Sequence, residues 1–348
     1  MARIWPSSRR SVRAIPRFLV LFFPVYIMLL MRSLMPVLLP ACVLGLVSSP
    51  QLLSKQQQLP GHMLQPALEE RAMCSPSPQT VLAARDALQE HGFVVLRGSA
   101  TGEGLLDSQL VHSARDEART DLDAMLSRLR KQGFDPDAAS FSFAEVVHRS
   151  ARRYDLRLDR RRLPPSSSWN FLSAAAAAWA VPILSTCDVQ ESLEVAVEGV
   201  LTSLPGAANQ RFHQDGPHKG SYNCFVPLVD VAAQKTGTEF WESSHTNPIV
   251  PELVLSGALG VAEASQLAAV AAGSGADGVT IVQPELSAGD MLLYDYRVIH
   301  RGPANPTSCA RPIYYCGWSD TAGAGDGYNF KEHRRLEDLE RRQALFGI

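Results

Sequence analysis

The second half of the chain alternates between short apolar runs and turns, and this pattern limits what the chain can fold into. The runs are rich in β-branched and aromatic residues, and turn-forming residues separate them, which is typical of short β-strands. We predict strands over residues 194–204, 221–231, 239–241, 279–282, 291–299 and 309–318. Several short strands with turns between them predict a sheet sandwich or a barrel.

Helical patterns precede these strands. Residues 80–91 place apolar side chains at helical spacing, and Gly92 ends this predicted helix before the apolar run 93–97, which we predict to be a strand. Residues 105–131 and the alanine-rich segment 174–179 are also predicted helices. Helices followed by a β-rich half indicate one α+β domain with a mainly β core and flanking N-terminal helices.

The chain divides into four parts by composition. Residues 51–78 are rich in Ser, Pro and Gln, which predicts an exposed linker after an N-terminal segment, residues 1–50. The folded domain is therefore expected over residues 79–330. A charged amphipathic helix is expected over residues 331–348, as a solvated tail. Inside the domain, the Ala- and Gly-rich residues 248–278 are expected to be an insertion that serves as a lid or a partner surface.

The N-terminal segment combines a basic head with apolar runs. Residues 1–17 carry five Arg, and the apolar runs 18–31 and 34–47 follow, which is typical of targeting or anchoring segments. A bilayer span needs about 20 apolar residues, and Arg32 and three prolines interrupt these runs. We expect a signal peptide or a membrane anchor into the endomembrane system, with membrane association through residues 18–47. An organellar presequence, for a plastid or mitochondrion, and an artefactual start are the alternatives.

The charge balance argues against nucleic acid as a partner. The chain has 33 basic and 35 acidic residues, a net charge of −2, and six of the basic residues but none of the acidic ones lie in residues 1–50. The remainder is therefore acidic and offers no net basic field. An arginine-rich run over residues 149–162 includes Asp155 and Asp159. This interleaving favours a solvated or self-paired surface over a site for a phosphate, a sulfate, CoA or a lipid head group.

Three residues form a candidate metal centre within the β-rich half. His213 and Asp215 are two positions apart, so in a strand their side chains project to the same side. His300 closes the predicted strand 291–299 and offers a second imidazole. Two His and one carboxylate leave coordination positions open, which suits a non-haem Fe(II) centre that binds a cosubstrate and O₂. A closed structural zinc site would need four ligands.

Arg311 follows His300 by eleven residues, on the next predicted strand. Its guanidinium presents a fixed fork of donors that can hold a carboxylate through two parallel hydrogen bonds. An isolated arginine would be assigned to the surface. In the company of the triad, we expect Arg311 to bind a carboxylate beside the metal.

These motifs, in this order, resemble the phytanoyl-CoA dioxygenase-like Fe(II)/2-oxoglutarate dioxygenases. The resemblance covers about residues 80–320. The matching segments are His213-Gln-Asp215, the strand Tyr222–Val231, Thr236–His245, Ser287–Met291, His300–Asn305 and Arg311-Pro312. One departure is Glu242-Ser243, where the family often has Pro-Gly, and the insertion after Asn247 is another.

The resemblance implies a fold, cofactors and roles. The fold is a double-stranded β-helix of the jelly-roll or cupin-like kind, with Fe(II) on His213, Asp215 and His300. Arg311 would anchor 2-oxoglutarate, the cosubstrate used with O₂. The resemblance also offers further residues as candidates for hydrogen bonds to 2-oxoglutarate: Gln210, Thr238 and Asn223. Because relatives that halogenate lack the carboxylate ligand, the presence of Asp215 implies hydroxylation.

We therefore expect an enzyme that hydroxylates a C–H bond of a small-molecule or lipid-like substrate and releases succinate and CO₂. Two alternatives stay open. One is a non-catalytic β-helix that binds a metal or ligand as a scaffold or sensor tethered to a membrane, and the other is a cupin-type metal enzyme without a cosubstrate. The sequence predicts neither the identity of the substrate nor the oligomeric state.

Overall fold

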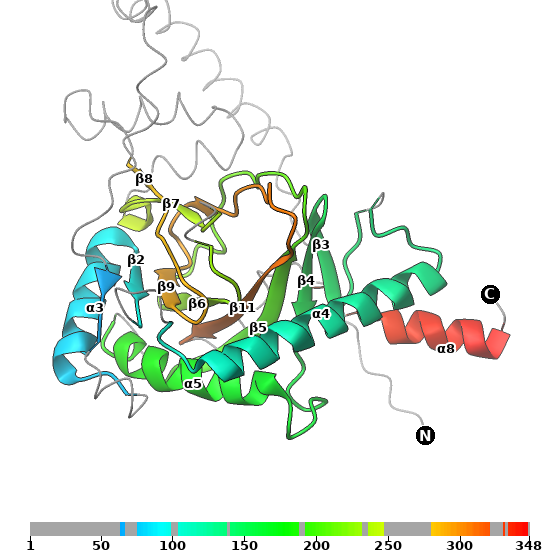
Figure 1. Ribbon diagram of the computed structural model, residues 1–348, viewed down its shortest axis with the longest axis horizontal. Coiled ribbons are helices and arrows are strands. Elements are labelled where there is room, and N and C mark those ends of the chain that lie inside the picture. The colour runs from blue at the N-terminus through cyan, green and yellow to red at the C-terminus, as the bar shows by residue number, and fades with distance from the viewer. Residues whose placement is uncertain are drawn as a thin grey trace, which may run out of the picture. The chain divides into compact units, whose positions relative to one another are not determined.

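Two β-sheets pack on each other at the centre of the computed structural model (Figure 1). The structure describes residues 63–66, 75–98, 104–137, 140–187, 192–231, 236–246, 280–320, 330 and 333–346. These residues belong to one unit, Gln56–Ile348. The predictions for residues 1–50, for most of the linker and for the insertion 248–278 fall outside the described residues. No described helix is both long enough and apolar enough to cross a membrane.

The larger sheet has eight described strands. Each pair of neighbouring strands in it is antiparallel, except the pair of β1 with β2, which is parallel. Its order is β1 (Met63–Leu64), β2 (Phe93–Leu96), β9 (Met291–Asp295), β6 (Ser221–Pro227), β11 (Arg311–Ser319), β5 (Glu194–Ser203), β4 (Arg153–Arg157) and β3 (Val146–Ser150). The smaller sheet has the order β10 (His300–Arg301), β7 (Glu239–Trp241) and β8 (Ile281–Val282).

From β5 to β11 the chain passes repeatedly from one sheet to the other. Strands β5, β6, β9 and β11 belong to the larger sheet, whereas β7, β8 and β10 belong to the smaller one. This exchange is the jelly-roll arrangement. The prediction of an α+β domain with a mainly β, jelly-roll core and flanking helices is confirmed.

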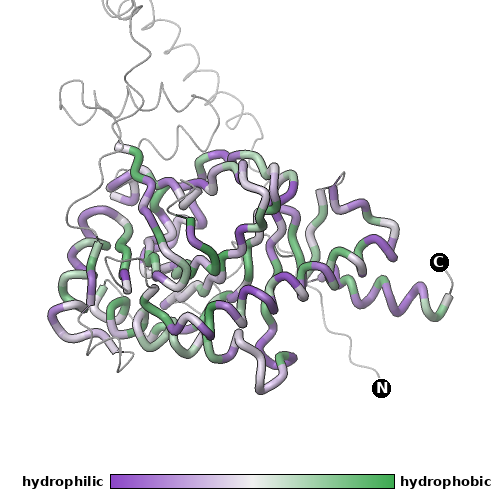
Figure 2. Tube along the Cα trace, viewed as in Figure 1, coloured by the Kyte–Doolittle hydropathy of each residue, from purple (hydrophilic) through white to green (hydrophobic). Residues whose placement is uncertain are grey.

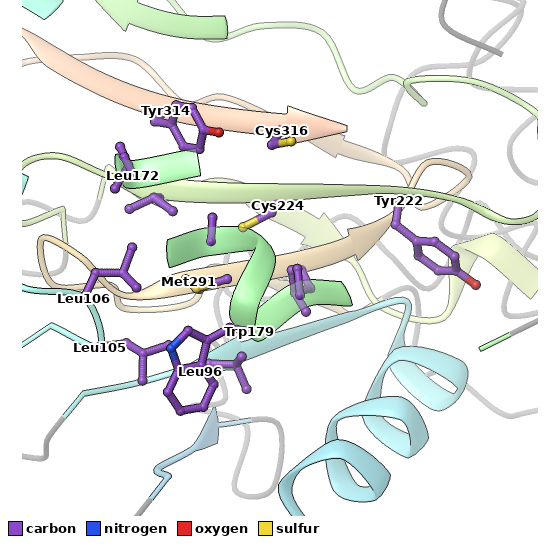
Figure 3. Packing of buried hydrophobic residues seen from close by; sticks show 14 of the residues in the cluster. Leu96, Leu105, Leu106, Leu172, Trp179, Tyr222, Cys224, Met291, Tyr314 and Cys316 are labelled. Atoms are coloured by element: carbon purple, nitrogen blue, oxygen red, sulfur yellow. The ribbon is translucent and has the colours of Figure 1, made fainter. Parts of the chain in front are cut away.

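Alternation along the strands separates two apolar layers. On β9, Leu292 and Tyr294 face the smaller sheet and join Phe240 and Val282 in one buried cluster. Met291 and Leu293, which alternate with them on β9, lie on the other face of the larger sheet. They belong to a second cluster with helices α3 (Pro78–His91) and α5 (Ser168–Leu184). Figure 3 shows part of this helix-side cluster: Leu96, Leu105, Leu106, Leu172, Trp179, Tyr222, Cys224, Met291, Tyr314 and Cys316. Both faces of the larger sheet are therefore covered.

Helix α3 ends where the chain must turn sharply into β2. Ser77 caps its first turn by accepting a hydrogen bond from Thr80 N at 3.2 Å. Gly92 ends it with φ of 85°, a left-handed conformation that favours glycine. A Cβ at this position would lie 2.7 Å from His245 Nδ1. The predicted helix stop at Gly92 is therefore confirmed, and the turn places β2 directly in the larger sheet.

The first turns of the C-terminal helix α8 (Leu336–Phe346) pack against α4 (Ser108–Lys131), whereas residues 341–345 are exposed, as expected for a solvated tail. The helix is mostly hydrophilic along its length (Figure 2). However, Leu336 is fully buried in a cluster with the second half of α4. Arg128 also binds Glu340 through two N–O contacts of 2.8 Å. Leu336, the partly buried Leu339 and polar contacts that include the bidentate ion pair of Arg128 with Glu340 hold this helix in place.

Candidate metal centre

Three side chains converge on one point between the sheets. His213 lies before β6, and its backbone exchanges two hydrogen bonds of 2.9 Å with that of His300 at the start of β10. This antiparallel bridge sets the two imidazoles beside each other, with ring centroids 4.6 Å apart. Asp215 follows two residues after His213, as the predicted alternation requires.

The three groups leave room for a metal ion between them. Oδ1 of Asp215 lies 4.0 Å from Nε2 of His213 and 3.7 Å from Nε2 of His300. Among the described residues, His213, Asp215 and His300 form the one cluster of metal-ligating side chains, with one ligand atom from each residue within 4.8 Å of the others. Ligand atoms around one ion at about 2.0–2.2 Å have such separations.

Both imidazoles present the nitrogen that a metal needs. Nδ1 of His213 lies 2.8 Å from the carbonyl oxygen of Arg211, and Nδ1 of His300 lies 3.1 Å from that of Val298. Each Nδ1–H therefore donates to the backbone, which leaves the Nε2 lone pair free for a metal. Burial, together with His300, lowers the pKa of His213 to about 4, so this imidazole is neutral at pH 7.

Two buried donors fix the carboxylate of Asp215. Its Oδ2 accepts hydrogen bonds of 2.7 Å from Asn223 Nδ2 and from the Tyr294 hydroxyl, which turns Oδ1 toward the imidazoles. Burial alone would raise the pKa of Asp215, but the two imidazoles and these hydrogen bonds outweigh it and hold the pKa below its ordinary value. The carboxylate is therefore ionised and oriented before any metal binds.

A cavity of about 460 Å³ opens beside this centre. All seven residues predicted from the sequence line it: Gln210, His213, Asp215, Asn223, Thr238, His300 and Arg311. The volume is in the range of small-molecule sites. Strands from distant parts of the sequence thus bring together a metal centre and a set of polar groups in one cavity.

Arg311 lies in the cavity wall, 4% exposed. Its guanidinium donates to the hydroxyl of Ser203 at 3.2 Å, to the carbonyl of Pro303 at 2.9 Å and to the carbonyl of Thr236. No acidic side chain in the described residues forms an ion pair with it. Burial, and then the charge of Arg153, lower the pKa of Arg311 to about 10. At pH 7 it is a buried cation that lacks an anion.

The other three predicted residues have different surroundings. Gln210 accepts a hydrogen bond from Gly302 N at 2.9 Å through Oε1, and Thr238 is buried immediately before β7. Asn223 contacts Asp215 and the Tyr294 hydroxyl, at 2.7 and 3.0 Å. Their hydrogen bonds to 2-oxoglutarate stay predictions.

A charged network that the sequence did not predict reaches the cavity from the arginine-rich run. Residues 146–157 form the hairpin of β3 and β4, which extends the larger sheet. Arg149 binds Oδ2 of Asp155 at 2.6 and 2.8 Å, and Tyr315 donates to Oδ1 at 2.9 Å. The expected self-pairing of this run is confirmed for Arg149 and Asp155. The expected exposure to solvent is wrong for Asp155, which is buried. The signal was the alternation of charged and apolar residues over 153–157.

The chain matches the family model "Phytanoyl-CoA dioxygenase (PhyH)" over residues 88–313, more than half of its length. Solved structures also match the chain. The non-haem alpha ketoglutarate dependent carbocyclase SnoK from nogalamycin biosynthesis is 14% identical, with 70% of this chain and 84% of that chain covered and a TM-score of 0.46. HygX from Streptomyces hygroscopicus, with nickel and 2-oxoglutarate bound, is 16% identical, with 73% and 97% covered and a TM-score of 0.44. None of the curated proteins matches the chain significantly.

Proposed function

Because the chain belongs to the phytanoyl-CoA dioxygenase family, we propose that it hydroxylates a C–H bond of a small-molecule substrate and releases succinate and CO₂. Membership makes the protein a 2-oxoglutarate-dependent dioxygenase that uses Fe(II) and O₂. It also favours an enzyme over a non-catalytic scaffold. The observation that carries the residue assignment is the triad of His213, Asp215 and His300 beside a cavity.

The triad fits Fe(II) in donor type and geometry. His213 and His300 would each bind through Nε2, and Asp215 would bind through Oδ1, on one face of the ion. Two imidazoles and one carboxylate on one face leave the opposite positions open to the cosubstrate. When bound together, Fe(II) and 2-oxoglutarate would activate O₂, the oxidant: one oxygen atom would go to the substrate C–H bond and the other to succinate, with loss of CO₂.

The protein's part in the reaction is to orient the reactants and to exclude water. We assign Arg311 to the carboxylate of 2-oxoglutarate that lies away from the iron, because it is a buried cation without an acidic partner. Gln210 and Thr238 line the same cavity and are candidates for its remaining hydrogen bonds. Leu201, Phe225 and Ile313 give the cavity an apolar wall, which keeps water from the reacting C–H bond.

The experiment that tests the proposed function follows oxygen into a product. Wild-type protein loaded with Fe(II) and 2-oxoglutarate is incubated with a metabolite extract under isotopically labelled oxygen gas. We expect one compound to gain a single labelled oxygen atom while labelled succinate forms. If wild type and His213→Ala give the same mass spectra, C–H hydroxylation is refuted for the substrates in that extract.

The subcellular localisation of the protein and the class of its substrate are separate proposals. The basic head and apolar runs of residues 1–50 support entry into the endomembrane system or attachment to its membrane. A fusion of residues 1–50 to a fluorescent protein would be expected to label those membranes, and a plastid or mitochondrial pattern would support the alternative. If the protein is attached to a membrane, we propose a lipid-like substrate, because such a substrate would be found in the same membrane.

A further inference from the structure

A second buried arginine, Arg153, lies beside Arg311 in the cavity wall. In the register of the larger sheet, Arg153 on β4 is opposite Ser203 on β5, and Ser203 is opposite Arg311 on β11. Directly opposed residues in antiparallel strands project to the same face. Arg153, Ser203 and Arg311 therefore form one row across three strands, and all three line the cavity.

The two guanidiniums share their acceptors. The Ser203 hydroxyl oxygen accepts from Arg153 Nε at 2.8 Å and from Arg311 Nη2 at 3.2 Å. The Pro303 carbonyl accepts from Arg153 Nη2 at 2.7 Å and from Arg311 Nη2 at 2.9 Å. Next to Pro303, Gly302 leaves room for Gln210, since a Cβ at this position would lie 2.5 Å from Gln210 Oε1. Both shared acceptors are neutral, so neither cation is compensated by them.

The pair retains unused hydrogen-bonding capacity. Arg153 is 0% exposed, and no carboxylate of the described residues forms an ion pair with it. Nη1 of Arg153, Nε of Arg311 and Oγ1 of Thr236 are buried without a hydrogen-bond partner, and all three residues line the cavity. Burial lowers the pKa of Arg153 to about 10, so it is still charged at pH 7. Two adjacent buried cations without an anion are costly unless a bound anion compensates them.

We propose that Arg153 and Arg311 together bind the distal carboxylate of 2-oxoglutarate, with Arg153 as a second cation that makes the site selective for a dicarboxylate. This inference rests on the proposed function, which supplies the cosubstrate. The unpartnered donors of Arg153 and Arg311 meet the several lone pairs of one carboxylate group. Binding at this end orients the cosubstrate, since its 2-oxo end then extends toward the metal centre in the same cavity.

A purely structural role for Arg153 predicts something different. If Arg153 serves only to hold the loop at Pro303, its removal should lower the thermal stability and leave the affinity of the folded protein for 2-oxoglutarate unchanged. If Arg153 binds the cosubstrate, replacing it should weaken 2-oxoglutarate binding selectively. The protein without cosubstrate should then be as stable as wild type or more stable, because a buried charge without an anion has been removed.

The experiment measures binding by calorimetry under anaerobic conditions, with Fe(II)-loaded full-length protein. Two compounds are compared: 2-oxoglutarate and 2-oxopentanoate, which has the same carbon chain without the distal carboxylate. For Arg153→Met, the affinity for 2-oxoglutarate should fall about tenfold to a hundredfold, the effect of removing a charge-assisted hydrogen bond, while the affinity for 2-oxopentanoate changes less than about threefold. Arg157→Met, on the same strand but outside the cavity lining, is the matched control and should behave like wild type.

Arg153→Gln guards against failure of the methionine variant to fold. A glutamine can keep one of the hydrogen bonds to Ser203 or Pro303 but carries no charge, so it must show the same selective loss. Equal affinity for 2-oxoglutarate in wild type and variants, or an equal loss for both compounds, overturns the inference. If wild type itself does not bind 2-oxoglutarate, the proposed function fails instead, and the two failures are thereby distinguished.

Discussion

The hydrogen bond from Tyr294 to Asp215 gives a quantitative prediction about metal affinity. In Tyr294→Phe, Oδ2 of Asp215 loses one of its two 2.7 Å donors and keeps Asn223. A hydrogen bond to a charged group contributes about 1.5–3 kcal/mol, and loss of a group that orients a metal ligand typically costs about tenfold to a hundredfold in affinity. Because Asn223 remains, we expect the lower half of that range, about tenfold to thirtyfold, or about 1.4–2 kcal/mol.

The fold should tolerate this change. The phenylalanine ring keeps the edge contact with Phe225, whose centroid lies 5.0 Å away, and the contact with Phe240 at 5.4 Å. Anaerobic titration of the apoprotein with Fe(II) measures the affinity. Tyr154→Phe is the control, since its buried hydroxyl donates to the Pro136 carbonyl at 3.0 Å and not to the metal centre. Equal Fe(II) affinity in wild type and Tyr294→Phe would refute the idea that Tyr294 orients the ligand.

Three further predictions concern stability. Gly199→Ala would place a Cβ 2.4 Å from the Tyr315 hydroxyl, so we expect chemical denaturation to show a loss of about 1–3 kcal/mol, and no loss would contradict this packing. Leu336→Ala should lower the free energy of unfolding by about 2–4 kcal/mol because Leu336 is fully buried, whereas a solvated α8 would show almost no change. Burial raises the pKa of Asp290 to about 6, so the Asp290 carboxyl binds its proton more tightly in the folded state than in the unfolded state. The protonated carboxyl therefore adds to the free energy of unfolding at low pH, and this contribution is lost as the pH rises through 6. Relative to Asp290→Asn, wild type should therefore lose about 2 kcal/mol between about pH 4 and pH 7 in urea unfolding, and a pH-independent difference would contradict this assignment.

A local pattern predicted two of the metal ligands, His213 and Asp215, because the spacing between them is local. The side-chain alternation of a strand is enough to place His213 and Asp215 on one side. His300 was predicted to close the strand 291–299, but β9 ends at Asp295 and His300 begins β10 in the smaller sheet, where its bridge to His213 brings the three ligands together. A local pattern also predicted the turn at Gly92, where one residue decides the conformation of the backbone.

The arginine-rich hairpin was not predictable in the same way. Residues 153–157 alternate as a strand does, but Tyr154 and Leu156 face the apolar cluster beneath α4, while Arg153 and Asp155 face the cavity. Charged residues on one face usually indicate solvent, and only the tertiary structure shows that Arg149 and Tyr315 bind Asp155 and that the Pro303 carbonyl accepts from Arg153. The alternation over residues 153–157 is a local signal for a strand, but the burial of its charged face depends on distant residues and leaves no local signal.

The contacts of helix α8 with α4 were not predicted for a related reason. The sequence of α8 is amphipathic but has few apolar residues, so the pattern does not show which part of the helix is buried. Its position depends on Leu336 and on the pairing of Glu340 with Arg128, which is 212 residues away in sequence. Contacts between such distant partners are set by the fold and not by the helix itself.

The central claim is that one cavity holds Fe(II) on His213, Asp215 and His300 and binds 2-oxoglutarate next to it. The most direct measurement is the absorption spectrum of the protein loaded anaerobically with Fe(II) and 2-oxoglutarate, followed by admission of O₂ and assay of succinate. Wild type should show a metal-to-ligand charge-transfer band that decays as succinate forms, and His213→Ala should show neither. If wild type shows no band and no succinate above His213→Ala, the claim is contradicted.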